Sequence, residues 1–170
     1  MIKVAPSILS ADFVNLERDI RSLPAAGADY VHVDVMDGMF VPNITIGIPV
    51  VQSIRKCTDM FLDVHLMIDK PVRYIEDFAK AGADLLSIHL EADHPTRIAQ
   101  ALEIMGKCGV KKAIALRPIT DARAVLPYIE QLRPLYPHGT EVRTRRDWRL
   151  FQWMMQTLGP KFTLWAASRR

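Results

Sequence analysis

The sequence predicts an α/β fold, with a parallel β-sheet covered by helices, over residues 1–132 of 170. Apolar, strand-like segments begin every 24 to 31 residues there, and a segment with helical periodicity follows each of them. The tetrapeptide Ala-Gly-Ala-Asp occurs at 26–29 and again at 81–84, each time directly before a strand, as in a repeated unit. Such a period is typical of two architectures, a closed (β/α)8 barrel and an open doubly wound sheet.

The expected elements alternate along the chain. Strands are expected at 4–9, 30–36, 61–68, 85–90 and 112–116, and helices at 12–23, 49–56, 71–80, 95–107 and 121–132. Local signals support these boundaries, because Asp12 can cap the first helix and Pro49 suits the first turn of the second. Both copies of Ala-Gly-Ala-Asp close a helix, and a long loop is expected over 38–47.

Two features favour the barrel over the open sheet. No Gly-x-Gly-x-x-Gly motif follows the first strand, which argues against the dinucleotide-binding form of the open sheet. Polar residues gather at the C-terminal ends of the strands, where a barrel carries its active site. These residues are Ser7, His32, Asp34, His65 and His89.

The expected barrel is incomplete at its C-terminal end, with about five βα units. Five strands do not close a barrel, and the period places a sixth strand near residue 138. The segment 133–149 contains two prolines and a dense run of charges, a poor composition for a central parallel strand. Beyond it, a helix over 149–158 and a strand fragment over 162–166 are expected.

Residues 133–170 differ in composition from the rest of the chain. They hold eight of the 22 Lys and Arg residues, two of the 19 Asp and Glu residues and all three tryptophans. We therefore divide the chain into a partial barrel, 1–132, and a divergent basic tail, 133–170, that is not native barrel sequence. Our hypothesis is that the tail comes from a shifted reading frame or alternative splicing. The weaker rival is a functional tail that binds nucleic acid or an acidic surface.

Composition argues against a membrane protein. The sequence has no apolar run of about 18 residues, and its N-terminus lacks the layout of a signal peptide. Cys57 and Cys108 lie far apart and in no ligand-like spacing. We therefore expect reduced thiols and a cytoplasmic location.

Candidate metal ligands occur on the second and third expected strands. Because alternate residues of a strand point to opposite faces, His32 and Asp34 share one face of their strand. Asp63 and His65 likewise share a face of the next strand. Two histidines and a carboxylate from adjacent strands suit a divalent cation with open coordination positions. The residue pattern alone leaves open the alternative that these are hydrogen-bonded residues of a polar sheet face.

Other polar and methionine residues extend the candidate site. Ser7 ends the first strand and could bind a substrate hydroxyl or phosphate, although a serine before a helix usually bonds to the backbone. Met36 and Met67 follow the candidate ligands and would project into the site, although core packing is the default role of methionine. His89 with Glu91 could form a further polar layer, but ordinary packing is favoured.

Three segments of the sequence resemble the ribulose-phosphate 3-epimerase family. They are SILSADF at 7–13, HVDVMDGMFVPNIT at 32–45 and DVHLM at 63–67, and the resemblance extends from residue 1 to about residue 132. It implies a (β/α)8 TIM barrel of the ribulose-phosphate binding type. It also implies a metal-dependent isomerase of carbohydrate metabolism, in the pentose phosphate and Calvin pathways. Such an enzyme interconverts D-ribulose 5-phosphate and D-xylulose 5-phosphate through an enediolate at C3.

The resemblance also implies roles for single residues and partners. The roles carried over are metal ligand for His32, Asp34 and His65, acid/base catalyst for Asp34, substrate contact for Ser7 and His65, and pocket lining for Met36 and Met67. The implied cofactor is a divalent cation (Zn, Fe, Mn or Co), the implied partner is a small sugar phosphate, and a homo-oligomer is compatible with the family.

The sequence departs from the family pattern after residue 132. The family's second acid/base aspartate, in an Asp-Gly-Gly stretch, its Pro-Gly-Phe-Gly-Gly segment and its glycine-rich phosphate loops have no counterpart there. Two smaller departures are Met39, where the family commonly has a polar residue, and Ile119, where it usually has glycine. We therefore expect impaired epimerisation or, as the alternative, an inactive or unstable barrel fragment. The open edges of its first and fifth strands would invite association.

Overall fold

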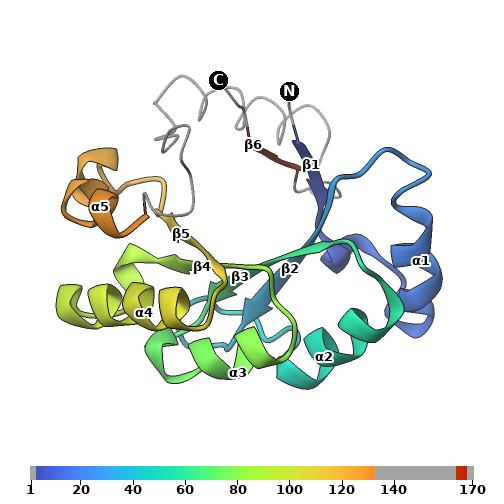
Figure 1. The fold of residues 1–170 in the computed structure, drawn as a ribbon, viewed down its shortest axis with the longest axis horizontal. Coiled ribbons are helices and arrows are strands. Elements are labelled where there is room, and N and C mark those ends of the chain that lie inside the picture. The colour runs from blue at the N-terminus through green and yellow to red at the C-terminus, as the bar shows by residue number, and fades with distance from the viewer. Residues whose placement is uncertain (1–2, 133–163, 168–170) are drawn as a thin grey trace.

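The computed structural model describes residues 3–132 and 164–167, and four parallel strands form its main sheet. These strands lie side by side in chain order (Figure 1): β2 (Tyr30–Met36), β3 (Phe61–Met67), β4 (Leu85–His89) and β5 (Lys111–Ala115). Strand β1 (Lys3–Pro6) continues the row beside β2 through a parallel bridge between Ser7 and His32. The parallel order confirms the predicted α/β fold with repeated βα units.

Helices connect the strands, and three of them begin with a 3-10 turn. The α-helices are α1 (Leu16–Ser22), α2 (Ile48–Cys57), α3 (Ile75–Lys80), α4 (Pro95–Lys107) and α5 (Ile129–Leu132). The 3-10 segments Phe13–Asn15, Pro71–Arg73 and Ala122–Tyr128 precede α1, α3 and α5. Figure 1 shows α2, α3 and α4 next to one another along one face of the sheet.

The helical segments expected at 12–23 and 121–132 begin at the expected aspartates but consist partly of 3-10 helix. Asp12 caps the 3-10 segment before α1, as predicted, because its side chain accepts a hydrogen bond from the amide of Val14. The helix expected over 121–132 is present and is capped by Asp121, but most of it is 3-10 helix and only Ile129–Leu132 is α-helix. Pro127 lies inside the 3-10 part and has no amide hydrogen to donate to an α-helical bond.

The repeated Ala-Gly-Ala-Asp tetrapeptide has the same structure in both copies. Its glycines, Gly27 and Gly82, have positive φ angles of 82° and 104°, a conformation that glycine adopts without strain. In the first copy the Asp29 carboxylate accepts the Val4 amide at 2.8 Å, and in the second the Asp84 carboxylate accepts the Leu62 amide at 2.8 Å. Each aspartate therefore fastens the start of a new strand to the strand before it in the sheet.

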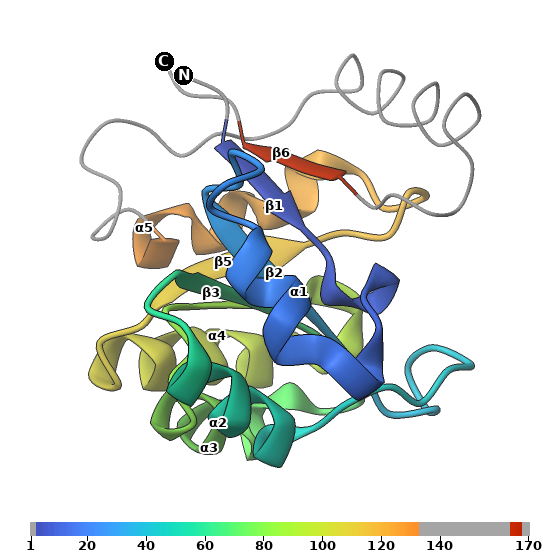
Figure 2. The same ribbon diagram turned by 90° about the vertical axis from the view of Figure 1, so that its right-hand side faces the viewer.

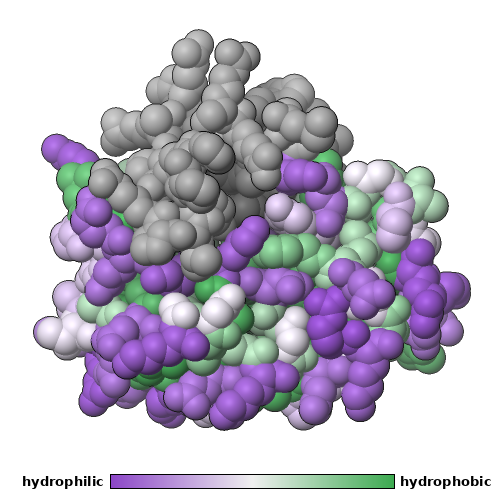
Figure 3. Space-filling model, in the orientation of Figure 1, coloured by the Kyte–Doolittle hydropathy of each residue, from purple (hydrophilic) through white to green (hydrophobic). Residues whose placement is uncertain are grey.

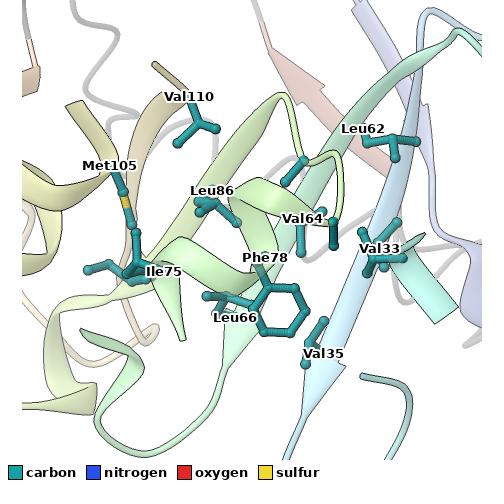
Figure 4. Packing of buried hydrophobic residues seen from close by; sticks show 14 of the residues in the cluster. Val33, Val35, Leu62, Val64, Leu66, Ile75, Phe78, Leu86, Met105 and Val110 are labelled. Carbon is teal, nitrogen blue, oxygen red and sulfur yellow. The ribbon is translucent and has the colours of Figure 1, made fainter. Parts of the chain in front are cut away.

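The two faces of the main sheet differ in polarity. The odd-numbered residues of β2 and the even-numbered residues of β3 and β4 are buried and apolar, and they pack against the helices. Figure 4 shows this layer, in which side chains from β2, β3, β4, α3 and α4 turn towards one another. Each fully buried Leu, Ile or Val side chain contributes about 1.5–3 kcal/mol to stability. The opposite face carries the polar residues His32, Asp34, Asp63 and Ser87.

The outer surface over the helices is mostly hydrophilic (Figure 3). This agrees with helices that bury one side against the sheet and expose the other to water. Of the helices in the described part of the chain, none has the length and apolar character needed to cross a membrane.

Strand β6 (Leu164–Ala167) lies antiparallel to β1, with Lys3 opposite Ala167 and Pro6 opposite Leu164 (Figure 2). A strand fragment was expected at 162–166, which overlaps β6. The expectation that the first strand would have an open edge was wrong, because β6 pairs with β1 along that edge. Neighbouring strands of a (β/α)8 barrel are all parallel, so this pair differs from barrel geometry. Within the described residues, β5 has a neighbouring strand on one side only. The expectations of a sixth strand near residue 138 and a helix over 149–158 lie outside the described residues.

Candidate active site

Charged side chains are buried on the polar face of β2 and β3. His32, Asp34 and Asp63 expose 3%, 5% and 2% of their surfaces. Burying a charge without a partner is costly, so side chains this deeply buried require close polar partners. The strand register supplies them, because it sets His32 opposite Asp63, and Asp34 opposite His65.

Three possible ligand atoms converge beside Asp34. Its Oδ1 atom lies 3.1 Å from His32 Nε2 and 3.2 Å from His65 Nδ1, and the ligand atoms of the three residues all lie within 4.8 Å of one another. The other ring nitrogen of His65, Nε2, is buried and has no hydrogen-bond partner among the described residues. Two imidazole nitrogens and one carboxylate oxygen are a donor set that divalent transition metals prefer. The structure thus brings together the three residues that the sequence suggested, and they fit a divalent cation.

Asp63 orients one of these candidate ligands. Its Oδ2 atom lies 2.9 Å from His32 Nδ1, on the side of the ring away from Asp34. A carboxylate that accepts the Nδ1 proton leaves Nε2 free to coordinate a metal and fixes the plane of the ring. Sequence analysis placed Asp63 on the polar face but gave it no role. Its role follows from the register between β2 and β3, which the sequence pattern does not specify.

The electrostatics of the cluster favour a positive charge at its centre. Burial alone would lower the pKa of His32, but its hydrogen bonds with Asp34 and Asp63 outweigh burial and raise the pKa to about 10. Burial would raise the pKa of Asp34, but hydrogen bonds from His32, His65 and Ser7 lower it far below its usual range. Two carboxylates therefore flank the His32 imidazole, Asp63 at Nδ1 and Asp34 at Nε2. A divalent cation held by His32 and Asp34 would take the place of the proton on Nε2.

Ser7 contacts the second oxygen of the same carboxylate. Its Oγ donates to Asp34 Oδ2 at 2.6 Å and also accepts a weaker bond from the Leu9 amide at 3.3 Å. The two oxygens of Asp34 are thus divided between the imidazoles and the serine. Met36 and Met67 stand opposite each other at the ends of β2 and β3, half-buried and two residues beyond Asp34 and His65.

His89 and Glu91, which the sequence suggested as a further polar layer, adjoin the first group. The His89 ring stacks on the His65 ring, with centroids 5.0 Å apart and planes inclined by 25°. Burial, followed by the nearby His65, lowers the pKa of His89 to about 4. The Glu91 carboxylate contacts His89 Nδ1 at 3.4 Å and accepts hydrogen bonds from the loop after β5. The sequence pattern favours simple packing here and gives no signal for the contact with this loop.

The family of the chain follows from its similarity to known proteins. The model of the family described as "Ribulose-phosphate 3 epimerase family" matches residues 3–135. The chain belongs to the ribulose-phosphate 3-epimerase family. Members of this family are TIM barrels, and the described residues provide about five of the βα units.

Named relatives of the family cover the same part of the chain. The ribulose-phosphate 3-epimerase of Bacillus subtilis is 52% identical over 125 residues, which are 74% of this chain and 57% of that protein. The cytoplasmic isoform of the rice enzyme, from Oryza sativa, is 43% identical over 135 residues, or 78% of this chain and 58% of that protein. The chain therefore spans little more than half the length of these relatives.

A solved structure from outside the family has a similar fold. Dihydropteroate synthase of Yersinia pestis, in complex with a pterine-sulfa conjugate, superimposes with a TM-score of 0.56. The similarity covers 91% of this chain and 67% of that one at 15% identity. At this identity the likeness concerns the fold alone.

Replacing Asp63 with asparagine is expected to weaken binding of Co²⁺ about 10-fold, because carboxylates that orient metal-bound histidines typically contribute this much. The amide keeps the shape of the side chain but removes the charge beside His32. Isothermal titration calorimetry of both proteins measures the effect. Asp69→Asn is the control, because the Asp69 carboxylate forms ion pairs with Lys70 and Arg73 on the surface. Equal affinities of Asp63→Asn and wild type would contradict the orienting role.

Proposed function

We propose that the chain carries the site of a metal-dependent epimerase that interconverts D-ribulose 5-phosphate and D-xylulose 5-phosphate by moving the proton at C3. The observation that supports this most directly is the convergence of His32 Nε2, His65 Nδ1 and Asp34 Oδ1 in a chain of the epimerase family. The ligand set proposed is the one that the sequence suggested. The cation would be Zn, Fe, Mn or Co.

Each residue of the cluster has a part in moving the proton. Asp34 is the base that removes it, and Ser7 and the two imidazoles hold its carboxylate in one place. These hydrogen bonds also lower the proton affinity of Asp34, so the C3 proton must be made more acidic. A bound divalent cation would do so by stabilising the negative charge that develops on the substrate oxygens. We assign substrate contacts to Ser7 and His65, and the walls of the pocket to Met36 and Met67.

Epimerisation also needs an acid on the opposite face of the substrate. Two other carboxylates in the described part of the chain lie beside the cluster, but both are already engaged. Asp63 contacts His32, and Glu91 accepts hydrogen bonds from the loop after β5, so we assign neither of them the role of this acid. We therefore propose that removal of the proton is retained while its return to the other face is impaired.

The alternative is a barrel fragment without catalysis of its own. Its support is the single neighbour of β5 among the described strands. We retain the division at residue 132, and the family match ends nearby at 135. The nucleotide sequence tests its origin. If no alternative frame past codon 132 encodes Pro-Gly-Phe-Gly-Gly-like residues, the hypothesis of a shifted frame is wrong.

Proton exchange at C3 of ribulose 5-phosphate in deuterated buffer separates these possibilities. We expect the full chain loaded with Co²⁺ to exchange the proton and to form little xylulose 5-phosphate, because Asp34 is present and the sequence after residue 132 has no Asp-Gly-Gly stretch that matches the family's second aspartate. Proton NMR follows the exchange, and a coupled assay follows the product. Removing the cation with a chelator should stop exchange. The fragment alternative predicts no exchange with or without the cation.

A further inference from the structure

A row of planar groups in contact leads from the surface to His65: the Phe40 and His89 rings are tilted by 45°, and the His89 and His65 rings are stacked. The guanidinium carbon of Arg117 lies 4.3 Å above the centre of the Phe40 ring. The Phe40 ring lies 5.0 Å from the His89 ring, and His89 lies 5.0 Å from His65. The row joins residues that are far apart in the sequence, because Phe40 and Arg117 are separated by 77 positions.

Hydrogen bonds tie the outer end of this row to two loops. Arg117 Nη2 donates to the backbone oxygen of Phe40 at 3.0 Å, which joins the loop after β5 to the loop after β2. The backbone amide of Arg117 donates to Glu91 at 2.8 Å, and Thr120 donates to the same carboxylate. Arg117 is therefore held by its own backbone while its side chain holds Phe40.

The other side of Phe40 is fixed by Asp37. The Asp37 carboxylate accepts the amides of Met39 at 2.9 Å and Phe40 at 3.0 Å, and also the amide of Asp69 at 2.8 Å. Within the loop, the Gly38 amide donates to Asn43 and the Thr45 amide donates to Met36. The backbone of Phe40 is therefore fixed by Asp37, and the Arg117 side chain contacts Phe40 from the loop after β5.

His65 needs such a support. The only hydrogen bond of its side chain among the described residues runs from Nδ1 to Asp34 at 3.2 Å, and Nε2 has no partner there. One hydrogen bond fixes the direction of a nitrogen but leaves the plane of the ring free to tilt. The His89 ring stacked on its face restricts that tilt.

We propose that Arg117 is a positioning residue: it clasps the loop over 38–47 and, through Phe40 and His89, holds the plane of the His65 imidazole. The effect on the cation rests on the proposed function, whereas the clasp itself rests only on the contacts described. The loop after β5 thus contributes to a site whose ligands all come from β2 and β3.

Arg117→Met tests the clasp in the full chain, because methionine keeps the length of the side chain but removes its charge and its donors. Hydrogen exchange of the Gly38 and Thr45 amides should become at least about 5-fold faster, since a charge-assisted bond and a cation–π contact are lost. Binding of Co²⁺ should weaken about 3- to 10-fold, less than after loss of a carboxylate that contacts a ligand directly. The visible absorption spectrum of bound Co²⁺ should also change, since the geometry around His65 relaxes.

Two further variants make this result specific. Arg117→Lys keeps the charge over Phe40, so its loop amides should retain most of the protection from hydrogen exchange that Arg117→Met loses. Lys111→Met removes a cation–π contact of the same kind, with Phe61 at 4.8 Å, at the opposite end of the sheet, and should change neither measurement.

The proposal would be overturned if the loop amides of Arg117→Met exchanged hydrogen at the wild-type rate and the Co²⁺ spectrum were unchanged. Faster loop exchange with unaltered Co²⁺ binding would overturn the link to His65. If wild type binds Co²⁺ and Arg117→Met behaves as expected, the clasp is supported even when no proton exchange at C3 is seen, which would count against the proposed function alone.

Discussion

Asp34→Asn is expected to reduce proton exchange at C3 by about 10³-fold or more, since loss of a general base alone removes about 10²- to 10⁴-fold. Asp34 accepts hydrogen bonds from His32, His65 and Ser7, so the two imidazoles and the serine meet at its carboxylate. An amide has no negative charge and offers one acceptor oxygen in place of two. Affinity for Co²⁺, measured by calorimetry, should therefore fall together with exchange.

Asp29→Asn is the matched control for Asp34→Asn. Asp29 also accepts hydrogen bonds from a side chain and a backbone amide, those of Lys3 and Val4, but it precedes β2 at the other end of the strand. It should leave Co²⁺ affinity unchanged. If Asp34→Asn binds Co²⁺ as wild type does, the cation site proposed here does not exist, whatever the outcome of the exchange assay.

The convergence of His32, Asp34 and His65 could be predicted in part, because strand alternation is a local property. His32 and Asp34 had to share a face wherever their strand lay, and so did Asp63 and His65. The pairings between strands are not local. The contact of Asp63 with His32 depends on the register of β2 against β3, and the contact of Ser7 with Asp34 depends on β1 lying beside β2. The row of contacts from Arg117 through Phe40 and His89 to His65 depends on loop conformations that a periodic pattern does not encode.

Element boundaries were predictable where a single residue type forces them. Helix α4 has the expected limits because Pro95 suits a first helical turn and Gly109, with a φ angle of 74°, lies just beyond its end. The segment from Asp121 to Leu132 has a helical period, but Pro127 favours a 3-10 conformation over most of it. The antiparallel partner of β1 could not be predicted, since nothing local to 164–167 specifies which edge it joins.

Leu86→Ala is expected to have the largest effect on stability. Leu86 is completely buried on β4, between β3 and β5, in the apolar layer that faces the helices (Figure 4). Removing a buried leucine side chain costs about 2–5 kcal/mol, because the transfer energy is lost and a cavity remains. A whole domain is usually stable by only about 5–15 kcal/mol, so this loss is a large fraction of the total.

Urea unfolding followed by circular dichroism measures this loss, with Leu126→Ala as the control. Leu126 is 58% exposed, so the same chemical change there should cost less than about 0.5 kcal/mol. A large difference between the two variants would show that the layer between the sheet and its helices holds residues 3–132 together as a cooperative unit. Equal effects, or no cooperative transition in wild type, would contradict this and favour the unstable fragment over an enzyme with one working base.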